Sequence, residues 1–149
     1  MRAILLAEFA DQLNSVMQVV TKEFAKRQVN ELYKGKITLP QFFVLDHLHL
    51  NAEAKMKDLA ACMDVTTAAI TGIVDRLVRV RLAVRCLEPH DRRIIKVRLT
   101  PSGEALVKKI YEQKRKMVID IFGKIPEGDR LEYLRILTRI KEVLRKEPK

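Results

Sequence analysis

The sequence predicts a mainly α-helical fold that carries one small β-hairpin. Residues 82–87 and 95–99 alternate between apolar and polar side chains, and a period of two is typical of half-buried strands. Apolar residues at helical spacing on both sides of this region predict the helices. The chain has 149 residues, of which 48% are hydrophobic, which is enough for one domain with its own core. We therefore expect residues 1–149 to form a single, mainly helical domain.

The N-terminal third predicts two helices. Residues 8–34 form the first, with an apolar stripe at helical spacing: Phe9, Leu13, Val16, Met17, Val20 and Phe24. Thr38 and Gln41 then fit a capping box, in which the first residue caps a helix and the second reaches back to its backbone. This helix continues through the apolar residues up to Leu48. Residues 51–54 are expected to form a loop.

Two short helices and the hairpin follow in close succession. Residues 55–63 and 66–80 predict the helices, with Thr66 as the N-cap of the second. In the hairpin, Leu82, Val84 and Cys86 alternate with the residues between them, and residues 88–93 form a polar, basic tip. Two short helices followed by a basic-tipped hairpin indicate a winged helix-turn-helix, which reads a duplex in two grooves.

The last third predicts two long helices. Thr100 caps and Pro101 starts a helix that ends near Gly123, and Pro126 starts another that runs to the C-terminus. The apolar stripes of the terminal helices exceed what a small winged-helix core can cover. A symmetric homodimer would bury them, and packing of these helices on each other within one chain is the alternative. We expect residues 1–36 and 101–149 to form dimerisation helices and residues 38–100 to form the DNA-binding region.

The charge distribution favours a nucleic-acid partner. The net charge is +10 and the pI is about 9.8, and residues 55–98 alone hold ten basic against five acidic residues.

The chain has no motif for catalysis and none for a cofactor. A metal site is not expected, because His47 and His49 lie about 200° apart on a helix. The two cysteines, and the lack of a signal peptide or a membrane span, predict a cytoplasmic protein.

Specific motifs resemble those of the MarR family of transcriptional regulators. The family pattern Asp-x-Arg in the wing is matched by residues 91–93, and its Leu-Thr-x-x-Gly pattern is matched by residues 99–103. Residues 70–77 are similar to the family's recognition helix. Three positions depart from the family. Asp64 and Arg81 stand where glycine is usual, and Gly72 stands where many members carry arginine. A left-handed backbone at Arg81 would cost about 1–2 kcal/mol.

The predicted DNA contacts lie on the second short helix and on the wing. Helix N-termini and threonine side chains suit phosphates and base edges in the major groove, and arginines suit a narrow minor groove. A carboxylate at Asp91 would brace one wing arginine and leave the other free, but the sequence does not say which. The candidates are Thr66, Thr67, Ala68, Thr71, Gly72, Arg76, Arg92, Arg93 and Lys96.

The resemblance also implies regulation by a small anionic aromatic ligand. Phe42, Phe43, His47 and Tyr111 are candidates for its pocket, with an ordinary core role as the alternative. Cys62 is expected to be a buried structural thiol that faces the packing side of its helix.

The function predicted overall is a homodimeric, ligand-responsive repressor that binds double-stranded DNA selectively. The alternative is an architectural or assembly protein that uses a winged helix for non-specific DNA contact.

Overall fold

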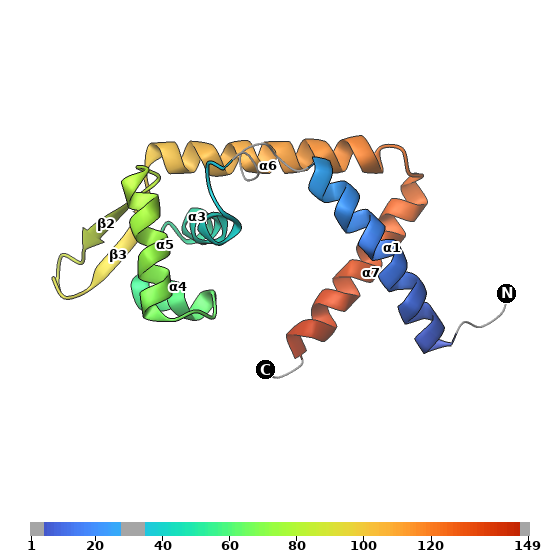
Figure 1. Ribbon diagram of the computed structural model, residues 1–149, viewed down its shortest axis with the longest axis horizontal. Coiled ribbons are helices and arrows are strands. Elements are labelled where there is room, and N and C mark those ends of the chain that lie inside the picture. Colours follow the sequence, from blue (N-terminus) through green and yellow to red (C-terminus); the bar gives the residue numbers. More distant parts are fainter. Residues whose placement is uncertain (1–4, 28–34, 147–149) are drawn as a thin grey trace. The chain divides into compact units, whose positions relative to one another are not determined.

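The computed structural model describes residues 5–27 and 35–146. Contacts divide the chain into two units, residues 1–113 and 114–149, and each is described separately. Helices dominate, and one small sheet accompanies them, which confirms the predicted fold class (Figure 1). The elements in order are α1 (Leu6–Arg27), α3 (Leu39–Asn51), β1 (Glu53–Lys55), α4 (Met56–Cys62), α5 (Thr67–Arg79), β2 (Ala83–Leu87), β3 (Ile95–Leu99), α6 (Pro101–Phe122) and α7 (Glu127–Lys146).

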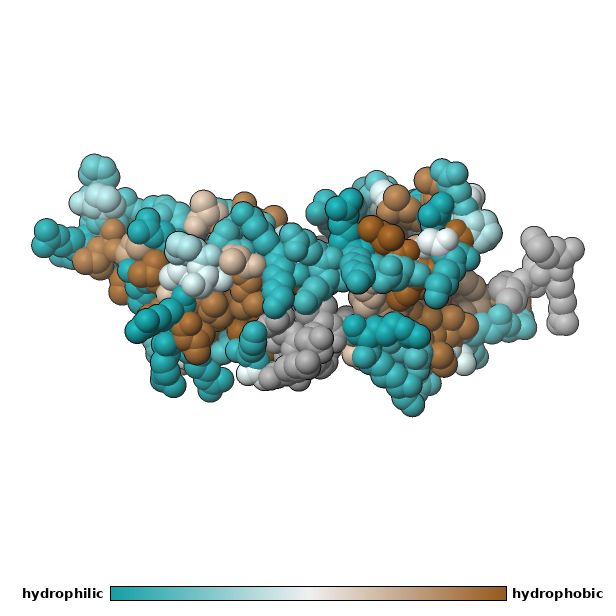
Figure 2. All heavy atoms as spheres, turned by 90° about the horizontal axis from the view of Figure 1, so that it is seen from above, coloured by the Kyte–Doolittle hydropathy of each residue, from teal (hydrophilic) through white to brown (hydrophobic). Residues whose placement is uncertain are grey.

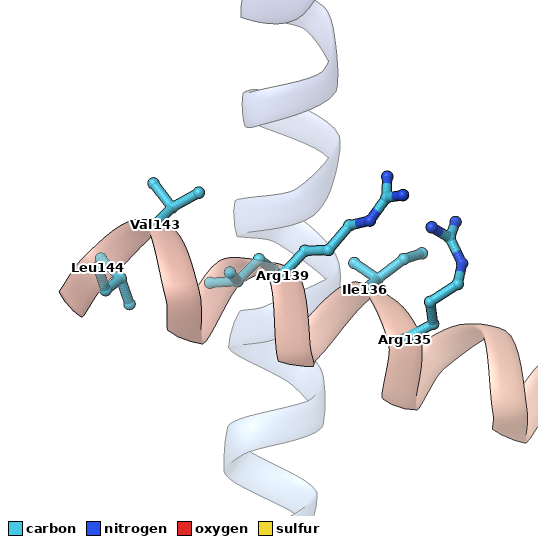
Figure 3. Close-up of a pocket in the computed structure, with 6 residues that line it drawn as sticks. Arg135, Ile136, Arg139, Val143 and Leu144 are labelled. Atoms are coloured by element: carbon cyan, nitrogen blue, oxygen red, sulfur yellow. The ribbon is translucent and has the colours of Figure 1, made fainter. Parts of the chain in front are cut away.

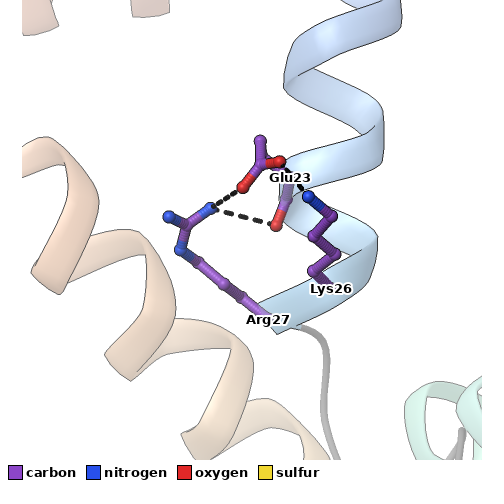
Figure 4. Close-up of polar contacts among 3 residues, drawn as sticks. All are labelled: Glu23, Lys26 and Arg27. Carbon is purple, nitrogen blue, oxygen red and sulfur yellow. Dashed lines mark hydrogen bonds and ion pairs between the residues drawn. The ribbon is translucent and has the colours of Figure 1, made fainter.

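The helix predicted for residues 8–34 falls only partly within the residues that the structure describes. It is observed as α1, which begins two residues earlier than predicted, and residues 28–34 lie outside the described part. At the C-terminal end of α1, Glu23 pairs with two basic side chains, Lys26 at 2.5 Å and Arg27 at 3.2 Å (Figure 4). These cations, with the hydrogen bond from Lys26 first, lower the pKa of Glu23. Basic side chains at this end also complement the helix dipole.

The sheet has three antiparallel strands in the order β1-β3-β2. Both strands of the predicted hairpin are present, and β1 adds a third strand on the far side of β3. The predicted loop over residues 51–54 is therefore wrong at its C-terminal end. A strand of three residues has no measurable periodicity, and β1 is ordered by its pairing, in which Ala54 lies opposite Val97.

The register of the sheet shows which side chains face the core. Ala83 lies opposite Leu99, and Arg85 lies opposite Val97, which is fully buried. Directly opposed residues project from the same face of an antiparallel pair. Ala83 and Arg85 therefore share the core side of β2, and Val84 and Cys86 project from the other side.

One hydrophobic core holds α3, α4, α5, the sheet and the first half of α6 together. Its fully buried side chains come from all of these elements: Val44, Leu45, Leu48, Leu59, Ile70, Val74, Leu77, Val97, Val107 and Ile110. Leu59 and Ala60 of α4 belong to the same core as Ile70, Val74 and Leu77 of α5. This core supports the two elements that carry the predicted DNA contacts.

The predicted helix starts are largely confirmed. The Thr38 hydroxyl accepts a hydrogen bond from the Gln41 backbone N–H at 3.4 Å, and the Gln41 side chain accepts one from the Thr38 N–H at 2.8 Å. The last helix begins one residue later than predicted, at Glu127, because Pro126 lies at the cap position and its carbonyl accepts from Arg130 at 3.1 Å. In the C-terminal unit, the rings of Phe122 and Tyr133 stack with centroids 5.5 Å apart.

The terminal helices α1 and α7 bury none of their described residues. Their exposed side chains include large hydrophobic ones, such as Val16 on α1 and Leu134 on α7. Figure 2 shows hydrophobic residues (brown) among hydrophilic ones at the surface. No described helix is both long enough and apolar enough to cross a membrane.

Candidate nucleic-acid interface

The turn between α4 and α5 is made by a residue with a left-handed backbone. Asp64 has φ 52° and directly follows the cap of α4. Its N–H donates to the Ala61 carbonyl at 3.2 Å, and the next N–H, of Val65, donates to the Ala60 carbonyl at 3.0 Å. This is the Schellman pattern of hydrogen bonds that ends many helices. Asp64 thus adopts the conformation that glycine usually takes, which aspartate tolerates better than most residues do.

Helix α5, the predicted recognition helix, ends on the same motif. Arg81 has φ 60°, its N–H donates to the Val78 carbonyl at 3.0 Å, and the Leu82 N–H donates to the Leu77 carbonyl at 2.9 Å. The backbone is therefore left-handed here even though the residue is arginine and not glycine. The backbone of Arg81 is strained as a result. The strained turn leads directly from α5 into β2, so it sets the direction in which the wing leaves the recognition helix.

Most predicted contact residues on α5 are exposed. Its buried side, Ile70, Val74 and Leu77, packs into the core and leaves the opposite side to solvent. Thr66 is the N-cap, as predicted, and its hydroxyl accepts from the Ala69 N–H at 3.1 Å. The exposed candidates on this helix and its cap are Thr66, Thr67, Ala68, Gly72 and Arg76.

Thr71 and Gly72 are the two positions on α5 where the structure refines the prediction. Thr71 is half-buried, and its hydroxyl donates to the Thr67 carbonyl at 2.7 Å, so its methyl group is the part freer to meet a base. A side chain added at Gly72 would meet nothing within 4 Å. The surface of α5 is therefore open at Gly72, and the backbone of this helix can approach DNA closely there.

The wing tip presents two arginines on a tightly hydrogen-bonded turn. Asp91 accepts from the Arg93 backbone N–H at 3.0 Å, and its own carbonyl accepts from the Ile94 N–H at 3.0 Å. The predicted brace is thus made to the backbone, and the structure records no ion pair from Asp91 to either guanidinium among residues 35–146. Both Arg92 and Arg93 are exposed at the tip. The carboxylate shapes the turn and leaves both arginine heads available.

Lys96 has a different environment from the tip arginines. Its ammonium lies 2.6 Å from Glu53 on β1 and 2.5 Å from Glu88, which follows β2. These two carboxylates raise the pKa of Lys96 above its ordinary value, with the hydrogen bond to Glu53 as the largest cause. The lysine therefore joins the outer strands of the wing across the middle strand, and its contact with a phosphate would compete with two carboxylates.

An ion pair links the wing to the recognition helix. Arg85 on β2 lies on the core side of the sheet, and its guanidinium is 2.7 Å from the carboxylate of Asp75 on α5. Sequence reasoning missed this pair. A signal for it existed in the strand alternation, which places Arg85 on the same side as Ala83, but the partner on α5 is known only from the fold.

The Leu-Thr-x-x-Gly pattern acquires a structural reason. The Thr100 hydroxyl accepts from the Gly103 N–H at 3.0 Å and donates to the Arg81 carbonyl at 2.7 Å. A Cβ at Gly103 would lie 2.0 Å from the Leu82 carbonyl oxygen. Glycine is thus required where the start of α6 meets the strained turn after α5. Thr100 is confirmed as the cap of α6.

The predicted pocket residues lie in different environments. Phe42 is buried in the core at 3% exposure, Phe43 is exposed at 50%, and His47 is half-buried. Tyr111 is half-buried on α6, and its hydroxyl donates a short hydrogen bond to Asp46 on α3. This bond raises the pKa of Tyr111 to about 12.

A second polar contact lies beside Tyr111. The Tyr111 ring meets the His49 ring edge-on, with centroids 5.5 Å apart, and His49 Nδ1 lies 2.9 Å from the Glu104 carboxylate. This imidazole, first through its hydrogen bond, lowers the pKa of Glu104. Two carboxylates, Asp46 and Glu104, therefore accompany the aromatic groups that the sequence proposes for a ligand.

The prediction for Cys62 is wrong. The thiol is exposed, and its sulfur lies 3.3 Å from Nδ1 of His47. The short helix α4 buries only Leu59 and Ala60, so its last residue falls outside the packed side. Among the described residues, no group of three or more His, Cys, Asp or Glu side chains could hold a metal ion.

Together, a helix-turn-helix with an exposed second helix and an arginine-tipped hairpin fixed to it define a winged helix-turn-helix. Comparison with known proteins agrees. The sequence model of the MarR family matches residues 36–94. The chain is 31% identical over 136 residues to the uncharacterized HTH-type transcriptional regulator YhbI of Bacillus subtilis, covering 91% of this chain and 86% of that protein.

Two further similarities, one in sequence and one in structure, point to the same class of protein. The HTH-type transcriptional repressor MdtR of Bacillus subtilis is 25% identical over 135 residues, covering 88% of this chain and 87% of MdtR. A MarR family protein from Bacillus stearothermophilus has the same fold, with a TM-score of 0.82 and 20% identity, covering 96% of this chain and 100% of that one. The chain belongs to the MarR family of winged helix-turn-helix transcriptional regulators.

Proposed function

We propose that this regulator is a homodimeric repressor that binds DNA selectively and responds to a small ligand. The observation that carries the proposal is that the wing and α5 share one buried core, which includes Val97 of the wing and Val74 of α5. The ion pair between Arg85 and Asp75, at 2.7 Å, also spans the two elements. One unit therefore presents an exposed helix and two exposed arginines as a joined surface. Such a surface matches a major groove and the adjoining minor groove.

The two parts of this surface have different roles. Thr67, Ala68 and Thr71 would meet base edges in the major groove, while the free N–H groups at the start of α5 favour phosphate. Arg92 and Arg93 would enter the minor groove, where a narrow, A·T-rich sequence attracts arginine. Thr66, Gly72, Arg76 and Lys96 belong to the same region as supporting contacts. In our proposal Lys96 acts mainly by keeping the wing rigid, because two carboxylates already hold it.

Dimerisation is supported by the exposed apolar faces of α1 and α7. On α7, the side chains of Ile136, Ile140, Val143 and Leu144, with two arginines at their side, line an open hollow on one side of the helix (Figure 3). Leu137 is 42% exposed and Leu144 is 65% exposed. Exposed apolar patches of this kind mark interaction sites, and a symmetric second copy would cover them. Residues 1–36 and 101–149 would then be the dimerisation helices, and residues 38–100 the DNA-binding region.

A ligand site near Tyr111 is proposed on the basis of its aromatic neighbours. Phe43 and His47 on α3 would complete the site with Tyr111, and Phe42 supports it from the core. The carboxylates of Asp46 and Glu104 disfavour an anion. They therefore favour an aromatic ligand with a neutral or cationic group over the anionic aromatic ligand that the family resemblance implies. Thermal shift with benzoate and benzylammonium at equal concentration tests the sign, since a ligand that binds the folded state raises the melting temperature.

Footprinting on the DNA upstream of the protein's own gene tests the proposed function. A selective regulator protects a discrete, pseudo-palindromic site in the presence of excess random competitor DNA, because specific affinity exceeds non-specific affinity by about 10³-fold or more. Binding that the competitor removes completely would instead support the architectural alternative. Genes of this class often adjoin those they control, so the upstream region is the first sequence to examine.

A further inference from the structure

A thiol and an imidazole from two different helices meet near the helix-turn-helix. Cys62 is the last residue of α4, and His47 lies in the middle of α3. The Cys62 sulfur is 3.3 Å from His47 Nδ1, which is within hydrogen-bonding distance for sulfur. Cys62 is exposed, so a molecule in solvent reaches it without unfolding the protein.

The pairing of these two groups has chemical consequences. With its own proton on Nε2, the imidazole accepts the thiol hydrogen at Nδ1. A nucleophile with a base in hydrogen-bonding reach is the arrangement that activates cysteine for attack on carbon. The other cysteine, Cys86, is half-buried on β2, and the structure records no imidazole beside it among residues 35–146. The two thiols in one chain thus provide an internal comparison.

We propose that Cys62 is a covalent modification site for soft carbon electrophiles, namely α,β-unsaturated carbonyl compounds and quinones, with His47 as its base. The sulfur forms a bond to the β-carbon, and the π electrons of the C=C bond move onto the carbonyl oxygen. The thiol proton passes to His47 Nδ1 and then to the α-carbon, so addition is complete with no leaving group. The step needs one thiol and no oxidant, which matches a site with one cysteine.

Modification at this position would act on DNA binding, and this part rests on the proposed function. Cys62 is followed by the left-handed turn at Asp64 and then by Thr66, the cap of the recognition helix. Three residues, 63–65, separate Cys62 from the cap residue Thr66. An adduct adds bulk next to a turn that has little freedom, because its two hydrogen bonds fix Asp64 and Val65. We infer that the adduct shifts the start of α5 and lowers affinity for DNA.

Reaction with N-ethylmaleimide, followed by peptide mass spectrometry, tests the chemistry. The rate at which N-ethylmaleimide modifies each thiol is measured in the folded protein and in the protein unfolded in urea. Exposure alone makes a folded thiol at best as fast as the unfolded one, so a folded rate about tenfold higher at Cys62 requires activation, and general base assistance is able to supply that much. Cys86 is expected to react more slowly folded than unfolded. A folded Cys62 rate equal to or below the unfolded rate would overturn the proposal.

Variants assign the activation to the imidazole. His47→Gln should bring the Cys62 rate down to its value in urea, and Cys86→Ser should leave the Cys62 rate unchanged. Circular dichroism checks that each variant is folded, and the folded-to-unfolded ratio in the wild type stands even if His47→Gln is unstable. An unchanged Cys62 rate in folded His47→Gln would show that the imidazole is not the base.

The effect on DNA is measured separately by gel shift with the footprinted site. Maleimide-treated protein should bind about tenfold more weakly, and treated Cys62→Ser should bind like untreated protein. Full affinity after complete Cys62 modification would refute the regulatory step. If the untreated protein binds no DNA, the proposed function fails, while selective modification of Cys62 still establishes the covalent site.

Discussion

Replacing Arg81 by glycine should stabilise the protein. Arg81 has φ 60°, a backbone region in which a side chain clashes with the backbone, and glycine adopts it freely. The two Schellman hydrogen bonds at this turn come from backbone N–H groups, so the substitution keeps both. The strain is therefore relieved without loss of a contact that the turn requires.

The expected gain follows from two opposing contributions. A left-handed non-glycine residue costs about 1–2 kcal/mol. Glycine returns about 0.5–1 kcal/mol of this because it has more freedom in the unfolded chain. The free energy of unfolding should rise by about 0.5–1 kcal/mol, and a chain of this size gains about 2–4 °C in melting temperature per kcal/mol.

Urea and thermal unfolding at equal protein concentration measure the change. Arg76→Gly is the matched control, because it removes the same charged side chain from an exposed position inside α5. There the backbone is helical, and glycine should destabilise by about 1 kcal/mol. If both substitutions destabilise the protein equally, the left-handed arginine is not strained and the reasoning is wrong.

Three other perturbations have expected outcomes. Gly103→Ala places a Cβ 2.0 Å from the Leu82 carbonyl oxygen and should lower the free energy of unfolding by about 1–3 kcal/mol, whereas Gly128→Ala, with nothing within 4 Å, should not. Leu137→Glu should weaken the dimer and DNA binding together, and a sedimentation profile like that of the wild type would contradict this. The pKa of Tyr111 is raised from 10.0 to about 12. Its stabilising contribution is complete below pH 10 and is lost as the pH rises towards 12, so Tyr111→Phe should show a smaller alkaline loss of stability in urea unfolding.

Local signals in the sequence were sufficient for the helix starts and the turns. The capping box at Thr38 and the caps at Thr66 and Thr100 depend on residues within three positions, and all three are observed. The left-handed turn at Asp64 was similarly readable, because aspartate tolerates that conformation. These features need no knowledge of the rest of the fold.

Features that depend on distant pairing were missed. Strand β1 exists because β3 supplies its hydrogen bonds, and the bond between Arg85 and Asp75 joins residues of two elements. Cys62 was misplaced because α4 has only seven residues, too few for a reliable packing side. For the same reason the contact between Cys62 and His47 had no signal in the sequence.

The most direct test of two-groove DNA reading compares Thr67→Val with Arg92→Ala. Fluorescence anisotropy measures each variant on the footprinted site and on random duplex over a range of salt concentrations. Arg92→Ala should weaken binding to both duplexes and reduce the salt slope by about 0.9, the value for one lost phosphate contact. Thr67→Val should change the ratio of specific to random affinity, by about 1–3 kcal/mol for one base contact, and leave the slope intact. Identical effects of the two variants on both duplexes would contradict a division of labour between the recognition helix and the wing.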